Sequence, residues 1–148
     1  MLYFLNKDKQ RAVTLQQTQN YNVVIIDDSE IDLELLAHIV SDLADVTIHK
    51  FQKASAALEF LTKKNKVSLD LVLCDYEMPT INGLDILVKF RKKNISIPFM
   101  FISACNSIEL TNLCKSEGAT DFIVKPFVTH NLLTKIEKAL NYQSGLNA

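Results

Sequence analysis

The stretch YNVVIIDD, residues 21–28, decides the fold of this chain. Its central residues, from Val23 to Ile26, are all apolar, and two aspartates, Asp27 and Asp28, follow them directly. An uninterrupted apolar run of this length is typical of a strand that is buried on both faces of a parallel sheet. Parallel strands are joined by crossover connections, so we expect a helix to follow.

The segments after residue 28 alternate between helix-like and strand-like patterns. Ser29-x-x-Asp32 is a helix-capping signal, and apolar residues with helical spacing come after it. The predicted strands are 23–26, 46–50, 69–74, 98–102 and 122–124, and the predicted helices are 31–43, 54–61, 84–88, 107–116 and 132–140. This alternation predicts an α/β fold with one doubly wound, five-stranded parallel sheet and helices on both faces.

The composition is that of one globular domain. The chain has 148 residues, 48% of them hydrophobic, and a formal net charge of −1 from 16 basic and 17 acidic residues. This balance gives no field that would attract nucleic acid, and no apolar run reaches the ~20 residues of a membrane helix. Three cysteines without CxxC spacing, and no secretory signal, favour a reducing cytoplasm. We assign 21–142 to the domain, 1–20 to an N-terminal extension of unknown role and 143–148 to a C-terminal tail.

Polar residues stand where four of the predicted strands end. Asp27 and Asp28 follow the first strand, Asp75 the third, Ser103 the fourth and Lys125 the fifth. The carboxyl ends of parallel strands share one edge of the sheet, and ligands of open α/β sheets bind in the crevice at that edge. The sequence therefore predicts one site with three carboxylates, a hydroxyl and an ammonium.

The chemistry of such a site follows from its charges. Two carboxylates ~4 Å apart repel by about 4 kcal/mol at an effective dielectric constant near 20, so the cluster favours a bound cation. Oxygen ligands favour Mg²⁺, with Asp28 and Asp75 as direct ligands and Asp27 as a ligand through water. Asp75 is then a candidate nucleophile for an aspartyl phosphate, with Lys125 neutralising the phosphoryl oxygens and Ser103 donating its hydroxyl to one of them.

Together these residues resemble the receiver domain of response regulators in two-component signalling, of the chemotaxis-regulator type. The resemblance covers about residues 22–141. It depends on an ordered set of motifs: Asp27-Asp28, Asp75-Tyr-Glu-Met-Pro79-x-x-Asn82-Gly83, Ser103-Ala104, and Gly118-Ala119-x-x-Phe122-x-x-Lys125-Pro126-Phe127.

The resemblance implies a flavodoxin-like strand order of 2-1-3-4-5 and a phosphoacceptor function. A histidine kinase or a histidine phosphotransfer protein would donate a phosphoryl group to Asp75, with Mg²⁺ as cofactor and Mn²⁺ as a substitute. The backbone carbonyl of Glu77 would complete the metal shell. Ser103 would move toward the phosphoryl group and Phe122 would turn inward with it. The surface of the fourth helix, fifth strand and fifth helix would then contact a downstream target, an effector domain or a second copy.

By the same resemblance the protein is not a turnover enzyme but catalyses its own phosphorylation and dephosphorylation. Two alternatives stay open. A phosphatase of the haloacid-dehalogenase type also uses an Asp nucleophile with a second acid two residues later, where Glu77 stands. Against it are the adjacent pair Asp27-Asp28 and the lack of a cap domain. The other alternative is a degenerate receiver that serves as a constitutive scaffold. Phe122 has its own alternative, a fixed core phenylalanine.

Overall fold

The computed structural model describes residues 3–5, 12–14, 20–43, 45–63, 67–94 and 96–146. Strands and helices alternate from residue 21 onward, as the sequence predicts. The elements are β3 (Tyr21–Ile26), α1 (Glu30–Ser41), β4 (Val46–Phe51), α2 (Ala54–Thr62), β5 (Leu71–Cys74), α3 (Gly83–Arg91), β6 (Phe99–Ser103), α4 (Ile108–Ser116), β7 (Asp121–Val124) and α5 (Thr129–Leu146).

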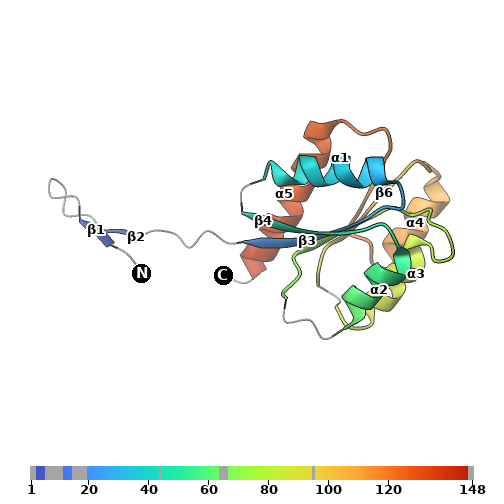
Figure 1. The fold of residues 1–148 in the computed structure, drawn as a ribbon, viewed down its shortest axis with the longest axis horizontal. Coiled ribbons are helices and arrows are strands. Elements are labelled where there is room, and N and C mark those ends of the chain that lie inside the picture. Colours follow the sequence, from blue (N-terminus) through green and yellow to red (C-terminus); the bar gives the residue numbers. More distant parts are fainter. Residues whose placement is uncertain are drawn as a thin grey trace.

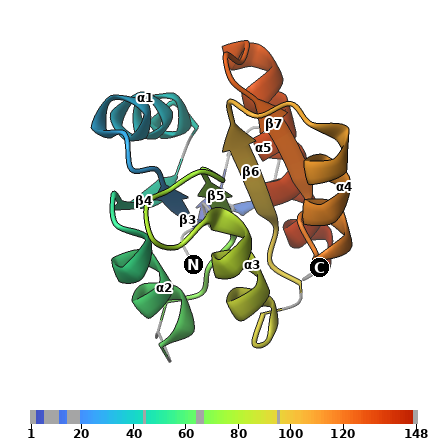
Figure 2. The same cartoon turned by 90° about the vertical axis from the view of Figure 1, so that its right-hand side faces the viewer.

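The five strands β3 to β7 form one parallel sheet in the order β4-β3-β5-β6-β7 (Figure 1). Counted within this sheet, the order is 2-1-3-4-5, so the predicted flavodoxin-like topology is confirmed. Figure 2 looks along the sheet and shows α1 and α5 on one face and α2 and α3 on the other. The carboxyl ends of the central strands therefore share one edge, where the sequence predicts the site.

Each face of the sheet has its own hydrophobic core. Along β3, Val23 and Ile25 pack into the core under α1 and α5, whereas Val24 and Ile26 pack into the core under α2 and α3. All four side chains are fully buried. Successive side chains of a strand point to opposite faces, so an uninterrupted apolar run is needed where both faces are covered. This requirement explains the uninterrupted apolar run from Val23 to Ile26.

Side-chain hydrogen bonds define the ends of several helices. Ser29, Asn82 and Ser107 each accept a hydrogen bond from the backbone N–H three residues later, at the starts of α1, α3 and α4. Such caps satisfy backbone donors that have no partner within the helix. No helix in the described ranges is long and apolar enough to cross a membrane.

Arg91 joins the end of α3 to the turn after α4. Its guanidinium donates two hydrogen bonds to the Gly118 carbonyl, at 3.0 and 2.8 Å. It also donates to the carbonyls of Asn94 and Ile97, at 2.8 and 2.6 Å. Gly118 has a φ of 106°, a conformation that L side chains rarely adopt. One side chain thus connects the loop between α3 and β6 to the turn after α4.

Two segments differ from the sequence interpretation. Within residues 1–20, β1 (Tyr3–Leu5) and β2 (Ala12–Thr14) pair antiparallel as a separate two-stranded sheet, which the sequence analysis does not predict. At the other end, α5 continues to Leu146. The segment 143–148, which we set apart as a tail, is therefore helical as far as residue 146.

Candidate functional site

The site lies at the carboxyl ends of β3, β5, β6 and β7. Two backbone hydrogen bonds align these ends, one from the Asp75 N–H to the Ile26 carbonyl and one from the Lys125 N–H to the Ser103 carbonyl, each 2.8 Å long. The strand ends thereby bring residues from four separate parts of the chain to one edge of the sheet. This placement is the one that the sequence pattern predicts.

Three aspartates form an acid cluster at this edge. Asp27, Asp28 and Asp75 each offer a carboxylate oxygen, and these oxygens lie within 4.8 Å of one another. Asp27 and Asp75 are buried, with 1% and 8% of their surface exposed, whereas Asp28 is exposed. A set of oxygen donors at this spacing, open to solvent on one side, fits a hard divalent cation such as Mg²⁺ that keeps some of its water. We call these three residues the acid cluster below.

The electrostatics of Asp75 show how unfavourable the cluster is without a cation. Burial raises the pKa of the Asp75 carboxyl from its ordinary value to about 7, against the lowering effect of the Lys125 ammonium. The charges of Asp27 and Asp28 raise the pKa further, and a backbone hydrogen bond from Tyr76 lowers it. Near neutral pH a proton and a cation therefore compete for this carboxyl.

Asp27 has both carboxylate oxygens engaged within the protein. Oδ1 accepts a hydrogen bond of 2.9 Å from the Ser29 N–H, and Oδ2 accepts one of 2.8 Å from Lys125 Nζ. This arrangement corrects part of the capping interpretation. The Ser29 hydroxyl accepts a hydrogen bond of 3.3 Å from the Asp32 N–H, as the signal predicts. In a complete capping box the Asp32 carboxylate would accept from the Ser29 N–H in return, but here that N–H donates to Asp27. The Asp32 carboxylate is therefore available for another partner.

That partner is Lys125. Its Nζ lies 3.0 Å from Asp32 Oδ2 as well as 2.8 Å from Asp27 Oδ2. Burial disfavours the ammonium, but these two hydrogen bonds, together with the negative charges of Asp75 and Asp27, outweigh burial and raise the pKa of Lys125. No ion pair joins Lys125 directly to Asp75 in the part of the chain that the structure describes. Sequence reasoning missed Asp32 because the capping pattern already accounted for it.

A glycine brings the loop after β5 close to the nucleophile candidate. A Cβ atom on Gly83 would lie 2.5 Å from the Asp75 carbonyl oxygen and 2.6 Å from the Phe101 ring. The Gly83 N–H also donates a hydrogen bond of 2.8 Å to the Tyr76 carbonyl. Only a residue without a side chain allows this approach, which fixes the path of the loop between Asp75 and α3.

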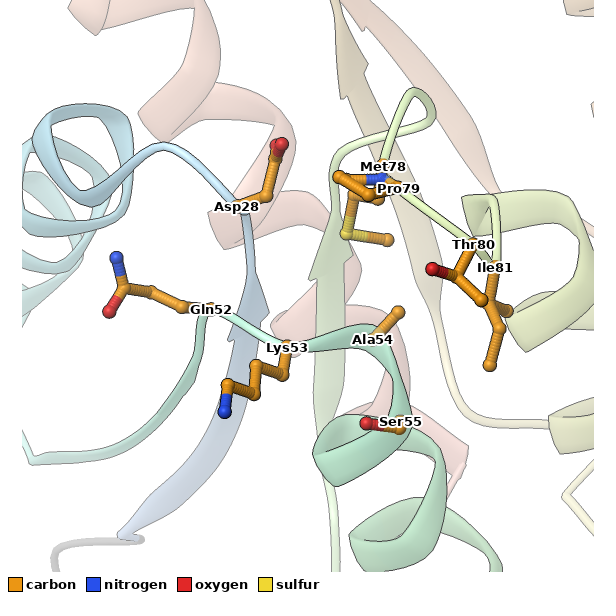
Figure 3. Close-up of a pocket in the computed structure, with 9 residues that line it drawn as sticks. All are labelled: Asp28, Gln52, Lys53, Ala54, Ser55, Met78, Pro79, Thr80 and Ile81. Atoms are coloured by element: carbon orange, nitrogen blue, oxygen red, sulfur yellow. The ribbon is translucent and has the colours of Figure 1, made fainter.

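A cavity of about 280 Å³ opens beside the acid cluster (Figure 3). Asp28 lines one side of it, and the loop with Met78 and Pro79 lies across from it. The start of α2 forms the floor, where the Lys53 side chain points away from Asp28. The full lining is Asp28, Gln52, Lys53, Ala54, Ser55, Met78, Pro79, Thr80 and Ile81.

The other predicted site residues lie around the cluster. Ser103 is buried, with 1% of its surface exposed, and its Oγ accepts a hydrogen bond of 3.3 Å from the Cys105 N–H. Phe122 is also buried, with its ring 6.0 Å from that of Phe101, which in turn lies 5.9 Å from the Tyr76 ring. Glu77 is exposed on the loop after Asp75.

Comparison with known proteins identifies the family. The family model described as "Response regulator receiver domain" matches residues 23–137. The chain is 32% identical to the chemotaxis protein CheY of Listeria monocytogenes, over 79% of this chain and 96% of that protein. It is also 32% identical to a protein-glutamate methylesterase/protein-glutamine glutaminase of Treponema denticola, over 83% of this chain and 33% of that protein. The chain thus spans about a third to a half of the first relatives, which include the response regulator TodT of Pseudomonas putida.

Solved structures show the same fold. A CheY-like receiver domain protein of Methanospirillum hungatei has a TM-score of 0.78 at 22% identity, covering 86% of this chain and 98% of that one. A receiver domain protein of Clostridium thermocellum has a TM-score of 0.77 at 23% identity, covering 85% and 98%. These matches give no support to the haloacid-dehalogenase alternative. The chain belongs to the response regulator receiver domain family.

Proposed function

We propose that this protein is a phosphoacceptor in which Asp75 receives a phosphoryl group from a phosphohistidine of a partner protein. The observation that carries the proposal is the convergence of Asp75, Asp27 and Asp28 within 4.8 Å, with Lys125 bound to the same cluster. This is the arrangement that in-line transfer to a carboxylate needs, because the attacking oxygen and the charge-neutralising groups must surround one position.

The transfer step uses groups of this chain in defined roles. A carboxylate oxygen of Asp75 forms the bond to phosphorus while the bond from phosphorus to the imidazole nitrogen breaks, and that nitrogen keeps the electron pair. Lys125 neutralises charge on the phosphoryl oxygens, and the Ser103 hydroxyl donates a hydrogen bond to one of them. A bound Mg²⁺ supplies further charge neutralisation on those oxygens. Neutralising the phosphoryl oxygens would lower their repulsion of the approaching Asp75 carboxylate.

Mg²⁺ would be held by the acid cluster. We assign Asp28 and Asp75 as direct ligands, Asp27 as a ligand through water and the backbone carbonyl of Glu77 as a further ligand. The two hydrogen bonds that Asp27 accepts from Ser29 and Lys125 suit an indirect role, since both of its oxygens already have partners. Mn²⁺ has a similar preference for oxygen ligands and would substitute.

The output is a change of surface, which begins at Ser103. Its hydroxyl is bonded to the Cys105 N–H, so a donation to the phosphoryl group would move the segment that leads into α4. Phe122 is the aromatic member of this switch, and its buried ring packs against Phe101. We propose that the surface of α4, β7 and α5 then contacts a downstream protein, an effector domain or a second copy of the chain. The donor would be a histidine kinase or a histidine phosphotransfer protein of the cytoplasm.

The return to the resting state would be self-catalysed hydrolysis. A water attacking the phosphoryl group has to approach past Glu77 and Cys105, which stand two residues after Asp75 and Ser103. The protein therefore acts on its own aspartyl phosphate and does not release a product from a separate substrate. Multiple turnover of a generic phosphomonoester would contradict this assignment and favour a phosphatase.

The proposal is tested by incubation with Mg²⁺ and a small phosphodonor such as acetyl phosphate, followed by intact-mass measurement. The wild-type protein should gain one phosphoryl group, and Asp75→Asn should gain none because the amide is not a nucleophile. Asp85→Asn is the matched control, because Asp85 is an exposed acid in the first turn of α3 and should leave the gain unchanged. An unmodified wild-type protein would overturn the assignment. A partner complex that forms equally well with Asp75→Asn and without Mg²⁺ would instead support the scaffold alternative.

A further inference from the structure

The Lys125 ammonium is held by two carboxylates, and only one of them belongs to the acid cluster. Nζ lies 2.8 Å from Asp27 Oδ2 and 3.0 Å from Asp32 Oδ2. Asp32 stands in the first turn of α1, 93 residues before Lys125 in the chain. The contact is thus a tertiary one, which ties α1 to the segment after β7.

This placement is unexpected on electrostatic grounds. Asp32 has 40% of its side chain exposed to solvent, whereas Asp75 is buried within the acid cluster. Attraction between opposite charges is stronger where water is excluded, so the two buried carboxylates, Asp27 and Asp75, should both be favoured over Asp32 as partners of the ammonium. Within the described residues, no ion pair joins Lys125 to Asp75. The second hydrogen bond, to Asp32, is the contact that explains where the ammonium lies.

The position of the ammonium matters to any cation in the site. A Lys125 ammonium bound to Asp75 would occupy the carboxylate that a divalent ion needs, and it would repel that ion at short range. An ammonium held beside Asp27 does not occupy the carboxylate oxygens of Asp75 and Asp28. The Asp32 contact therefore separates two positive charges that would otherwise compete for one carboxylate.

We propose that Asp32 is a positioning residue whose carboxylate holds the Lys125 ammonium beside Asp27 and off Asp75, and so keeps Asp75 open to Mg²⁺. This inference rests on the proposed function in one respect, the identity of the ion. The competing interpretation is that Asp32 only stabilises the start of α1, where an acidic residue interacts favourably with the helix dipole. Glu30 shares that role, since it lies in the same first turn of α1.

Glu30 is therefore a matched control. It is exposed, and in the described part of the chain its carboxylate has no hydrogen bond or ion pair. Asp32→Ala and Glu30→Ala remove the same charge from the same helical turn, and alanine is favourable in a helix. We expect Asp32→Ala to lower the affinity for Mg²⁺ about five- to tenfold, and Glu30→Ala to lower it less than about twofold. Calorimetric titration without any phosphodonor measures both affinities.

A double-mutant cycle separates positioning from a general effect of charge. Lys125→Met removes the ammonium and keeps most of the apolar stem. In that background Asp32→Ala should lower the Mg²⁺ affinity no more than Glu30→Ala does, because Asp32 then has no ammonium to hold. In the metal-free crystal structure of Asp32→Ala, we expect Lys125 Nζ within hydrogen-bond distance of an Asp75 carboxylate oxygen.

The outcomes distinguish this inference from the proposed function. If Asp32→Ala and Glu30→Ala behave alike, or if Asp32→Ala causes the same loss with and without Lys125, the positioning role is overturned while wild-type Mg²⁺ binding leaves the phosphoacceptor assignment intact. If the wild-type protein binds no Mg²⁺ and gains no phosphoryl group, the proposed function itself fails. Circular dichroism of each variant checks that α1 and the rest of the fold are retained.

Discussion

Asp75 carries a charge that the fold disfavours until a cation is present. Burial raises the pKa of its carboxyl to about 7, and the charges of Asp27 and Asp28 raise it further. Between about pH 4 and pH 7 the folded protein therefore keeps a proton that the unfolded chain has released. Stability contributed by this group falls as the pH rises through that range. A local loss of stability of this kind is typical of residues at functional sites.

We expect Asp75→Asn to stabilise the metal-free protein at pH 8. The amide cannot ionise, so the variant avoids the unfavourable charge, and we expect a gain of about 1–3 kcal/mol in the free energy of unfolding after allowance for solvent access. The gain should largely disappear near pH 4, where the wild-type carboxyl is protonated in the folded state and about half protonated in the unfolded chain. Urea unfolding at the two pH values measures it. Asp85→Asn should show no such pH dependence, and a gain that is constant from pH 4 to pH 8 would contradict the explanation.

Side chains at the site divide into those that sequence reasoning could place and those that it could not. Asp27, Asp75 and Lys125 were placed correctly because each follows an apolar strand, and topology alone brings parallel strand ends together. The sequence does not reveal Asp32 as a partner of Lys125, because its spacing from Ser29 also fits a capping box. An acidic side chain suits either role, so the residue type does not distinguish them. The choice depends on which acid reaches the Ser29 N–H, and only the folded geometry shows that Asp27 does so.

At the scale of elements, the sequence predicts the presence and order of strands and helices better than the residues at which they begin and end. The sequence predicts the third strand from residue 69, whereas β5 begins at Leu71; just before it the Asp70 carboxylate accepts a hydrogen bond from the Asn22 N–H. Similarly, α5 runs to Leu146 through the segment that the sequence analysis set apart as a tail. Apolar periodicity locates the buried part of an element, whereas its ends depend on local hydrogen bonds.

Arg91 gives a test at this scale. Its guanidinium donates to the carbonyls of Gly118, Asn94 and Ile97, which a lysine cannot reproduce because its ammonium is a single point of donation. We expect Arg91→Lys to lower the free energy of unfolding by about 1–3 kcal/mol, since half-buried carbonyls lose their donors. Chemical denaturation measures the loss. The exposed neighbour Lys92 is the control, and Lys92→Ala should change stability little; equal losses would contradict the role of the guanidinium.

For the whole molecule, binding of the proposed cation to the acid cluster would be linked to folding. Its oxygens come from β3 and β5, so they are brought together only in the folded state. An ion that binds the folded state alone stabilises it by mass action, by about 2.7 kcal/mol at a hundredfold excess over Kd. The same principle makes the metal-free protein the less stable form at neutral pH.

We therefore expect Mg²⁺ to raise the thermal unfolding midpoint at pH 8 and to raise it much less at pH 5. At pH 5 the Asp75 carboxyl, with its pKa of about 7, is protonated and cannot serve as a ligand. Calorimetry with and without Mg²⁺ at both pH values measures the effect. In Asp75→Asn, Mg²⁺ should raise the thermal unfolding midpoint only slightly at either pH. If Mg²⁺ raised the midpoint of the wild-type protein equally at pH 5 and pH 8, the role of Asp75 would be contradicted.

The four hydrogen bonds of Arg91 also constrain how the fold can deform. They anchor the Gly118 turn, and with it the trailing end of α4, to the body of the domain. Within the residues that the structure describes, the leading end, at Ser107, has no comparable side-chain contact to another loop, and it follows directly from the segment after Ser103. A displacement that starts at Ser103 would therefore rotate α4 about its C-terminal end at Gly118. The exposed Ile108, at the start of the helix, would move most, and the residues next to Gly118 would move least.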